Sequence, residues 1–138
     1  MKLATRERRL TGQTRTALAA ALLATACGST TTSSAPTTTQ TFSGTLTSGG
    51  ASLQLVTVAK DGEIDLTLTS LVPQTTITVG LGLGVPQNGT CGLLDDIENA
   101  KIASVLSDEV TAGTYCILIY DVGNIQGSDT YTLTVAHS

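Results

Sequence analysis

The segment Gly113-Thr-Tyr-Cys-Ile-Leu-Ile-Tyr-Asp121 is the most apolar run of the chain outside its N-terminal region. It is rich in aromatic and β-branched residues and has turn-forming residues on both sides, which predicts a buried β-strand. Alternation along that strand places Tyr115, Ile117 and Ile119 on the side that faces a core. Cys116 then points to the opposite face. We expect the globular part of the protein to pack around this strand.

Short alternating runs separated by turn residues continue from Thr41 onward, which is typical of an all-β sandwich or barrel. Glu63-Ile-Asp-Leu-Thr-Leu-Thr69 alternates apolar and polar residues, and so does Thr130-Tyr-Thr-Leu-Thr-Val135. Each run predicts a strand with one buried and one solvated face. Aromatic residues make up only 3% of the chain. The core must therefore be built from Leu, Ile and Val.

Two segments do not show a clear pattern. In Ser52–Val58, the leucines and the valines fall on opposite faces, which a β-bulge or a change from edge to central strand would reconcile. The segment from Asp96 to Ala103 reads either as a loop or as one turn of helix.

Three glycines alternate with apolar residues in Thr76–Val85, at Gly80, Gly82 and Gly84. They share the face of the predicted strand that lies opposite its apolar residues. No helical period follows, so this is not a phosphate-binding loop. We expect these glycines to allow a close approach of neighbouring groups.

Several of these strands resemble a known family. Gly113–Asp121, a short loop and Ser128-Asp-Thr-Tyr-Thr-Leu-Thr-Val135 resemble the closing strands of bacterial pre-peptidase C-terminal domains. In that family a Gly-x-Tyr-x-Ile/Val-x-Val/Ile strand pairs with a Tyr-x-Leu-x-Val strand. Phe42-Ser-Gly-Thr-Leu46 is similar to the start of the family, so the resemblance covers about residues 41–136. It implies a jelly-roll-like β-sandwich of about seven to eight mostly antiparallel strands, which is non-catalytic in most members.

The N-terminal region has the parts of a secretory signal peptide. A basic stretch precedes the apolar run Ala17–Ala24, and small residues follow it. The apolar run is much shorter than the ~20 residues that a transmembrane helix needs. Residues 1–26 are therefore expected to be a leader.

The leader ends in Leu23-Ala-Thr-Ala-Cys27, which resembles a bacterial lipobox. That resemblance implies acylation of the Cys27 thiol and anchoring to a membrane through palmitate-like chains. Because residue 28 is Gly and not Asp, it further implies the outer membrane of the bacterial envelope. The alternative is ordinary cleavage after Ala26, which would release a soluble periplasmic or secreted protein.

Residues 27–40 are rich in Ser and Thr and contain almost nothing that could be buried. Such a composition predicts a disordered tether, with a root-mean-square reach of roughly 20 Å. The chain is thus divided into a leader (1–26), a tether (27–40) and a β-sandwich domain (41–138).

With Cys27 assigned to lipid, Cys91 and Cys116 remain as a pair. In an exported domain this number favours a disulfide. It would hold the segment that carries Cys91 against the strand Gly113–Asp121. A zinc site is the alternative, but two cysteines and one distant histidine are too few ligands.

The charged residues exclude one class of partner. Residues 27–138 hold two basic and ten acidic residues, a net charge of −8. That charge repels phosphate backbones and argues against nucleic-acid binding.

We expect no enzymatic activity. The only histidine, His137, lies near a C-terminus that we expect to fray, and the chain has no Gly-x-Ser-x-Gly elbow. The acids Asp95, Asp96 and Glu98 form the densest carboxylate cluster and are weak candidates for calcium binding. Solvated loop acids are the simpler interpretation, and no other cofactor is expected.

Two classes of function fit these features. The first is a membrane-anchored structural or protein-interaction module. The second is a module that binds glycan or extracellular matrix, with calcium as a conceivable aid. Buried Tyr115 and Tyr131 would favour the first class, because exposed tyrosines are what a glycan-binding groove requires.

Overall fold

The computed structural model describes residues 36 and 38–138, and all regular structure in them is β. Cys27, the leader and most of the expected tether lie outside these residues. The strands are β1 (Thr38–Thr47), β2 (Ala51–Val58), β3 (Gly62–Val72), β4 (Val79–Gln87), β5 (Thr90–Ala100), β6 (Val105–Val110), β7 (Gly113–Asp121) and β8 (Ser128–His137). The predicted all-β class is therefore confirmed.

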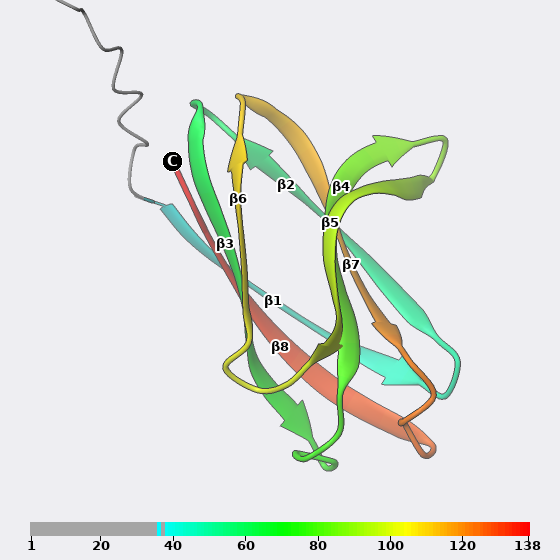
Figure 1. Cartoon of the computed structure of the whole chain (residues 1–138). Coiled ribbons are helices and arrows are strands. Elements are labelled where there is room, and N and C mark those ends of the chain that lie inside the picture. Colours follow the sequence, from blue (N-terminus) through cyan, green and yellow to red (C-terminus); the bar gives the residue numbers. More distant parts are fainter. Residues whose placement is uncertain (1–35, 37) are drawn as a thin grey trace, which may run out of the picture. The chain divides into compact units, whose positions relative to one another are not determined.

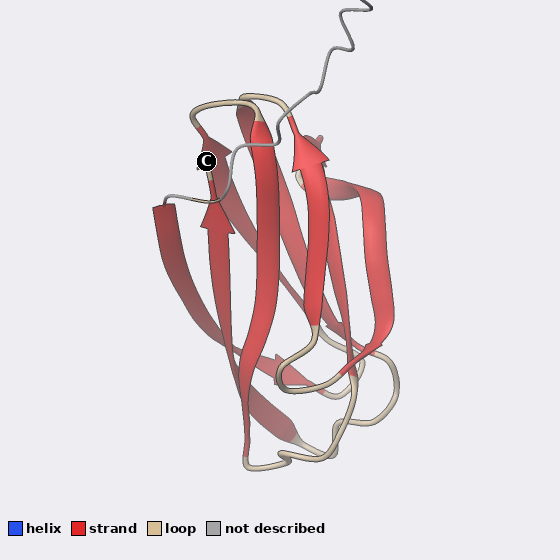
Figure 2. Ribbon diagram, turned by 60° about the vertical axis from the view of Figure 1, so that its left-hand side comes forward, coloured by secondary structure: helices blue, strands red, loops and turns tan. Residues whose placement is uncertain are grey.

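The eight strands form two four-stranded antiparallel sheets that pack face to face (Figures 1 and 2). One has the order β1-β8-β3-β6 and is called the β8 sheet below; the other has the order β2-β7-β4-β5 and is called the β7 sheet. Apart from the β4–β5 hairpin, consecutive strands lie in different sheets. This is the arrangement of a jelly roll, as the sequence predicted.

The core lies between the sheets and consists mainly of aliphatic side chains, together with Tyr115 and Tyr131. On β7, Tyr115, Ile117 and Ile119 face inward and are buried, as their alternation predicted. The clean alternation of β3 buries Ile64, Leu66 and Leu68 completely. The remaining core residues come from the strands, with Ala100 as the one buried contribution of β5, and from Ile125 in the loop between β7 and β8.

Neither explanation offered for β2 holds, because β2 has no bulge and is an edge strand of its sheet. The ladder between β2 and β7 runs in one register from Ala51 to Val58, so the residues alternate without interruption. Ser52, Gln54, Val56 and Val58 point inward, whereas Leu53 and Leu55 are 37% and 54% exposed. The two inward polar residues have a partner in the core: Gln54 Nε2 donates to the Tyr131 hydroxyl at 3.1 Å, and Ser52 Oγ lies 2.7 Å from it.

Three further expectations are corrected. β1 begins at Thr38, inside the expected tether. The segment from Asp96 to Ala103, expected as a loop or one turn of helix, begins as a β-strand, because β5 continues to Ala100. His137 is not frayed: β8 lies between β1 and β3 to its end, and the imidazole is 3% exposed with Nε2 3.0 Å from Gln40 Nε2.

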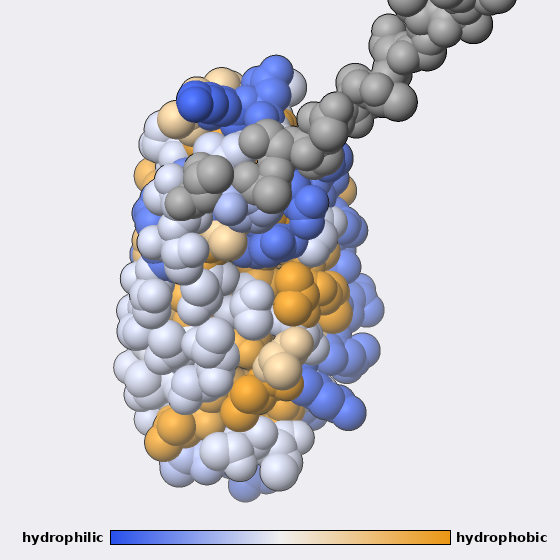
Figure 3. Space-filling view, turned by 90° about the vertical axis from the view of Figure 1, so that its left-hand side faces the viewer, coloured by the Kyte–Doolittle hydropathy of each residue, from blue (hydrophilic) through white to orange (hydrophobic). Residues whose placement is uncertain are grey.

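Hydroxyl side chains dominate the outer face of the β8 sheet. They come from β1, β3 and β8 and are Thr39, Thr41, Ser43, Thr45, Thr47, Thr67, Thr69, Thr130, Thr132 and Thr134. Figure 3 views the side of the molecule that lies at the left in Figure 1. It shows a broad pale area of intermediate hydropathy next to hydrophilic side chains in blue and smaller apolar patches in orange. Within the described residues, no helix is long and apolar enough to span a membrane.

Candidate interaction face

The outer face of the β7 sheet holds most of the residues that could serve a function, and it is called the outer face below. Side chains reach it from alternate positions of each strand. On β7 these are Cys116, Leu118 and Tyr120, which are the residues between the core positions. The neighbouring β4 offers three glycines and Pro86 there, and β2 offers leucines.

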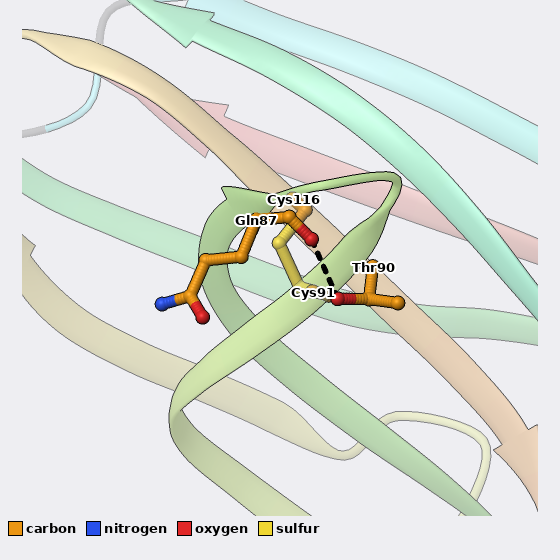
Figure 4. Close-up of a disulfide and its surroundings, with 4 residues drawn as sticks. All are labelled: Gln87, Thr90, Cys91 and Cys116. Carbon is orange, nitrogen blue, oxygen red and sulfur yellow. Dashed lines mark hydrogen bonds between the residues drawn. A yellow bond between two sulfur atoms is a disulfide. The ribbon is translucent and has the colours of Figure 1, made fainter.

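A disulfide joins Cys91 of β5 to Cys116 of β7, with the two Cα atoms 5.8 Å apart (Figure 4). The pairing predicted from the cysteine count is therefore present, and it lies on the face opposite the core, as expected. The bond connects two strands that are not neighbours, because β4 lies between them. Cys116 is fully buried under the end of the β4–β5 hairpin.

The hairpin reaches this position through a two-residue turn. Asn88 and Gly89 both have positive φ values, 50° and 82°, which is the conformation of a type I′ turn. Thr90 Oγ1 donates to the carbonyl oxygen of Gln87 at 2.6 Å and closes the turn (Figure 4). Next to the turn, Cys91 is held opposite Pro86.

Gly84 makes room for the disulfide. It pairs with Cys116 in the ladder between β4 and β7, and so lies under the bond. A Cβ atom at Gly84 would stand 2.3 Å from the Gly92 carbonyl oxygen and 2.9 Å from Cys91 Sγ. The predicted role of the glycines as points of close approach is confirmed here.

The other two glycines of β4 are covered by side chains. The Tyr120 ring lies over Gly80, where a Cβ atom would be 2.0 Å from Cζ. Leu93 lies over Gly82, where a Cβ atom would be 2.6 Å from Cδ2. The residues that cover these glycines are thereby fixed in place on the outer face.

Apolar side chains form a continuous strip across the outer face. Leu118 is opposite both Leu53 and Gly82, and Leu93 covers Gly82. Leu55 lies two residues along β2 from Leu53, opposite Cys116. We call Leu53, Leu55, Leu93 and Leu118 the leucine strip. Three of its members are exposed: Leu53 to 37%, Leu55 to 54% and Leu93 to 41%.

A shallow open hollow lies on the outer face at the Tyr120 end of β7, away from the disulfide. It has a volume of about 360 Å³ and is lined by Glu98, Asn99, Tyr120, Val122 and Asn124. The Tyr120 hydroxyl donates to Asp96 Oδ2 at 3.4 Å. Partial burial, and then the charges of Asp96 and Glu98, raise the pKa of Tyr120. The phenol therefore stays protonated and able to donate a hydrogen bond at neutral pH.

The loops below the hollow are fixed by Asp121. Its Oδ2 accepts from Gly49 N at 2.8 Å, and its Oδ1 accepts from the amides of Gly123, Asn124 and Ile125. These bonds, with that to Gly49 the largest, lower the pKa of Asp121 to about 2. Asn124 Nδ2 in turn donates to Thr78 Oγ1 at 2.6 Å, which orients one wall of the hollow.

The three weak calcium candidates do not come together as one set, although Asp96 and Glu98 both lie near Tyr120. Asp95 is opposite Leu83, a core residue, whereas Asp96 is opposite Gly82 on the outer face. Glu98 lines the hollow. In residues 36 and 38–138, no group of three or more His, Cys, Asp or Glu is placed to hold a metal ion. The acids are exposed on a strand and are not loop ligands.

Sequence reasoning named the disulfide but missed the leucine strip and the hollow. The sequence of β2 contained a signal for the strip. Its leucines and its valines lie on opposite faces of the strand, so either the leucines or the valines had to be exposed. The structure also settles the question about the tyrosines: Tyr115 and Tyr131 are 7% and 0% exposed, and only Tyr120 reaches the surface.

No protein-family model matches this sequence, and no curated protein matches it significantly. Solved structures do match its fold. A periplasmic inhibitor of g-type lysozyme from Aeromonas hydrophila, PliG, superposes with a TM-score of 0.54 at 12% identity, covering 74% of this chain and 86% of that one. The Yersinia pseudotuberculosis-derived mitogen gives a TM-score of 0.52 at 20% identity, covering 75% and 87%.

The pre-peptidase C-terminal domain of collagenase from Bacillus anthracis also matches. The TM-score is 0.52 at 18% identity, and the match covers 70% of this chain and 87% of that domain. The fold implied by the sequence resemblance is thus confirmed. At these identities the three likenesses show a shared fold, and the function must be argued from the residues of this chain.

Proposed function

We propose that this protein is a non-catalytic lipoprotein of the bacterial envelope, whose β-sandwich binds another protein through the outer face. The observation that carries the proposal is the leucine strip. Three of its four leucines are exposed on a sheet face that is crosslinked by a disulfide and whose glycines are covered by neighbouring groups. Exposed, contiguous apolar side chains on a soluble domain are typical of interaction sites.

The disulfide supports an envelope or secreted location, because such bonds persist in oxidising compartments. The fold is compatible with a role in binding, since one protein that shares it is a periplasmic inhibitor of g-type lysozyme. Non-catalytic behaviour is further supported by His137, which is buried in β8, away from the hollow and the leucine strip.

The binding face can be tested by site-specific photo-crosslinking in the cell envelope. A photoreactive residue at Leu93 should give a discrete crosslinked product with a partner protein. The same residue at Thr45, which is exposed on the β8 sheet, is the matched control. Equal crosslinking from both positions, or none from Leu93, would contradict a binding role for the outer face.

The lipid anchor rests on the sequence pattern ending at Cys27 and is tested separately. Radiolabelled palmitate should be incorporated into the wild-type chain and not into a Cys27→Ala variant. An unlabelled wild-type protein would contradict anchoring, and the chain would then be a soluble periplasmic or secreted protein. Its binding face would be unaffected.

The hollow favours a second candidate function, the binding of a glycan. It combines the accessible Tyr120 ring with polar side chains of Glu98, Asn99 and Asn124, which is the mixture that sugar sites use. A Tyr120→Ala variant should then lose retention on a glycan matrix while its crosslinking through Leu93 persists. If the variant keeps both its glycan retention and its crosslinking, protein binding remains the function of this face.

A further inference from the structure

We propose that the edge of β2, which no other strand of the described residues pairs with, is a self-association site, at which β2 pairs antiparallel with β2 of a second copy of this chain. This inference goes beyond the proposed function. It concerns the edge of the sheet rather than its outer face, and it needs neither the lipid anchor nor another protein.

The hydrogen-bonding pattern of the ladder shows which backbone groups are free at this edge. Asp121 N donates to the Gly50 carbonyl oxygen at 2.9 Å, so residue 50 is hydrogen-bonded to β7. In an antiparallel pair, hydrogen-bonded positions recur at every second residue. The even-numbered residues of β2 therefore bond to β7, and the amides and carbonyls of Ala51, Leu53, Leu55 and Thr57 face the open edge.

Nothing on β2 protects this edge from another strand. Natural edge strands are blocked by lysine, proline, bulges or short length. β2 is eight residues long, has the sequence Ala-Ser-Leu-Gln-Leu-Val-Thr-Val and pairs with β7 in one unbroken register. Its exposed leucines, Leu53 and Leu55, add apolar area that strand pairing would partly bury.

The two edges on the other side of the sandwich are protected. β6 is only six residues long and carries Asp108 and Glu109. Glu109 is directly opposite Glu63, and the pKa of Glu63 is raised, mainly by the neighbouring Asp65. β5 carries three acids and has two register shifts against β4.

The distribution of charged side chains limits how a second copy of this chain can approach. The described residues hold ten acids and two bases, so two copies of the domain repel each other on most approaches. Residues 38–59, which make up β1, β2 and the turn between them, contain no charged side chain. A second copy can therefore meet this region through its own uncharged edge. β1 is uncharged as well, but its exposed side chains are Thr and Ser, and it offers no apolar area comparable to the leucines of β2.

A twofold axis between two antiparallel β2 strands gives an isologous interface. It would join two four-stranded β7 sheets into one eight-stranded sheet. Leu53 and Leu55 of both copies would then lie side by side on one continuous outer face. The interface has no ion pairs, so salt should strengthen the dimer by screening the repulsion between the acidic bodies.

The test is sedimentation equilibrium of the full chain, expressed with its leader and purified whole, in detergent if it carries lipid. The wild type should form a concentration-dependent dimer that tightens with added salt. Thr57→Lys places an ammonium group on the edge and should give a monomer with an unchanged circular dichroism spectrum. Thr45→Lys makes the same exchange on β1 and should remain dimeric.

Hydrogen exchange provides a second readout that depends on the interface alone. In the dimer, the amides of Leu53 and Leu55 should be protected, and in Thr57→Lys they should exchange rapidly. The amides of Gln54 and Val56 should be protected in both proteins. If Thr57→Lys does not fold, Leu55→Lys serves in its place.

Three results would overturn the proposal. They are a wild type that stays monomeric at every concentration, a dimer that Thr45→Lys dissociates as well as Thr57→Lys does, and a dimer in which Leu53 and Leu55 exchange freely. Photo-crosslinking from Leu93 to another protein could still succeed in each case, so the proposed function is tested independently.

Discussion

The hydroxyl of Tyr131 joins the two sheets, because it lies on β8 while its partners, Ser52 and Gln54, lie on β2. The ring itself covers Gly44 of β1, where a Cβ atom would come within 2.7 Å of the hydroxyl oxygen. One side chain thus fills a gap in its own sheet and also satisfies two polar groups that the other sheet turns inward. This explains why β2 tolerates polar residues at core-facing positions.

Tyr131→Phe removes the shared partner of these two polar groups. We expect a loss of about 1–3 kcal/mol in the free energy of unfolding, because Ser52 and Gln54 would be left without their bond to this oxygen. Urea denaturation measures the change. In the Ser52→Ala background the same substitution should cost less, and equal costs in both backgrounds would contradict the shared bond.

Asp121 makes the stability depend on acid. Because its pKa in the folded protein is about 2, below its ordinary value of 3.8, the ionised carboxylate stabilises the fold above pH 4. That contribution is lost as the pH falls from 4 to 2. Asp121→Asn should therefore be less stable than the wild type at pH 7, and the two melting temperatures should converge near pH 2. A difference that does not change with pH would contradict this account.

At the scale of the strands, the glycines of β4 let groups of the neighbouring strands pack directly against its backbone. Gly80, Gly82 and Gly84 are each covered by a different group of β5 or β7, so the outer side of β4 is buried although it has no side chains there. The hairpin of β4 and β5 can then fold over the sheet and bring Cys91 to Cys116.

Gly84→Ala should damage this arrangement, because the new methyl group would clash with the backbone of Gly92, which no side-chain movement can relieve. We expect a loss of about 1–3 kcal/mol in stability and slower formation of the disulfide. Gly113→Ala is the matched control, since the nearest atom to its Cβ would be 3.8 Å away. Thermal unfolding with and without reductant measures both effects, and equal behaviour of the two variants would refute this role of Gly84.

At the scale of the whole molecule, the disulfide closes a loop with a sequence separation of 25 residues. Closing a loop of that size stabilises a fold by about 3 kcal/mol in the chain-entropy model. We expect the reduced protein to unfold at a correspondingly lower urea concentration with an unchanged fold below the transition. Near-ultraviolet circular dichroism and urea titration check both parts, and an unchanged midpoint would contradict a stabilising role.

The sequence predicted the architecture where one face of a strand is buried and the other solvated, as in Glu63–Thr69 and Thr130–Val135. It failed at β2, because Ser52 and Gln54 point inward to a tyrosine that is distant in sequence. It also failed at β5, an edge strand whose register shifts and exposed leucines remove any simple period. The hollow joins residues of β5, β7 and a loop, so only the strand order could reveal it.

The position of β8 has a consequence for the order in which the protein can fold. All strands of the β7 sheet precede Val122, and that sheet can form, with its disulfide, before β8 has been made available. β1 is different, because its one neighbour in the sheet is β8, and Gln40 meets His137 across 97 residues of sequence. In a chain that emerges N-terminus first, β1 therefore has no sheet neighbour until β8 has emerged. We expect the insertion of β8 between β1 and β3 to be the late, slow step, because a contact of such long range is costly in chain entropy.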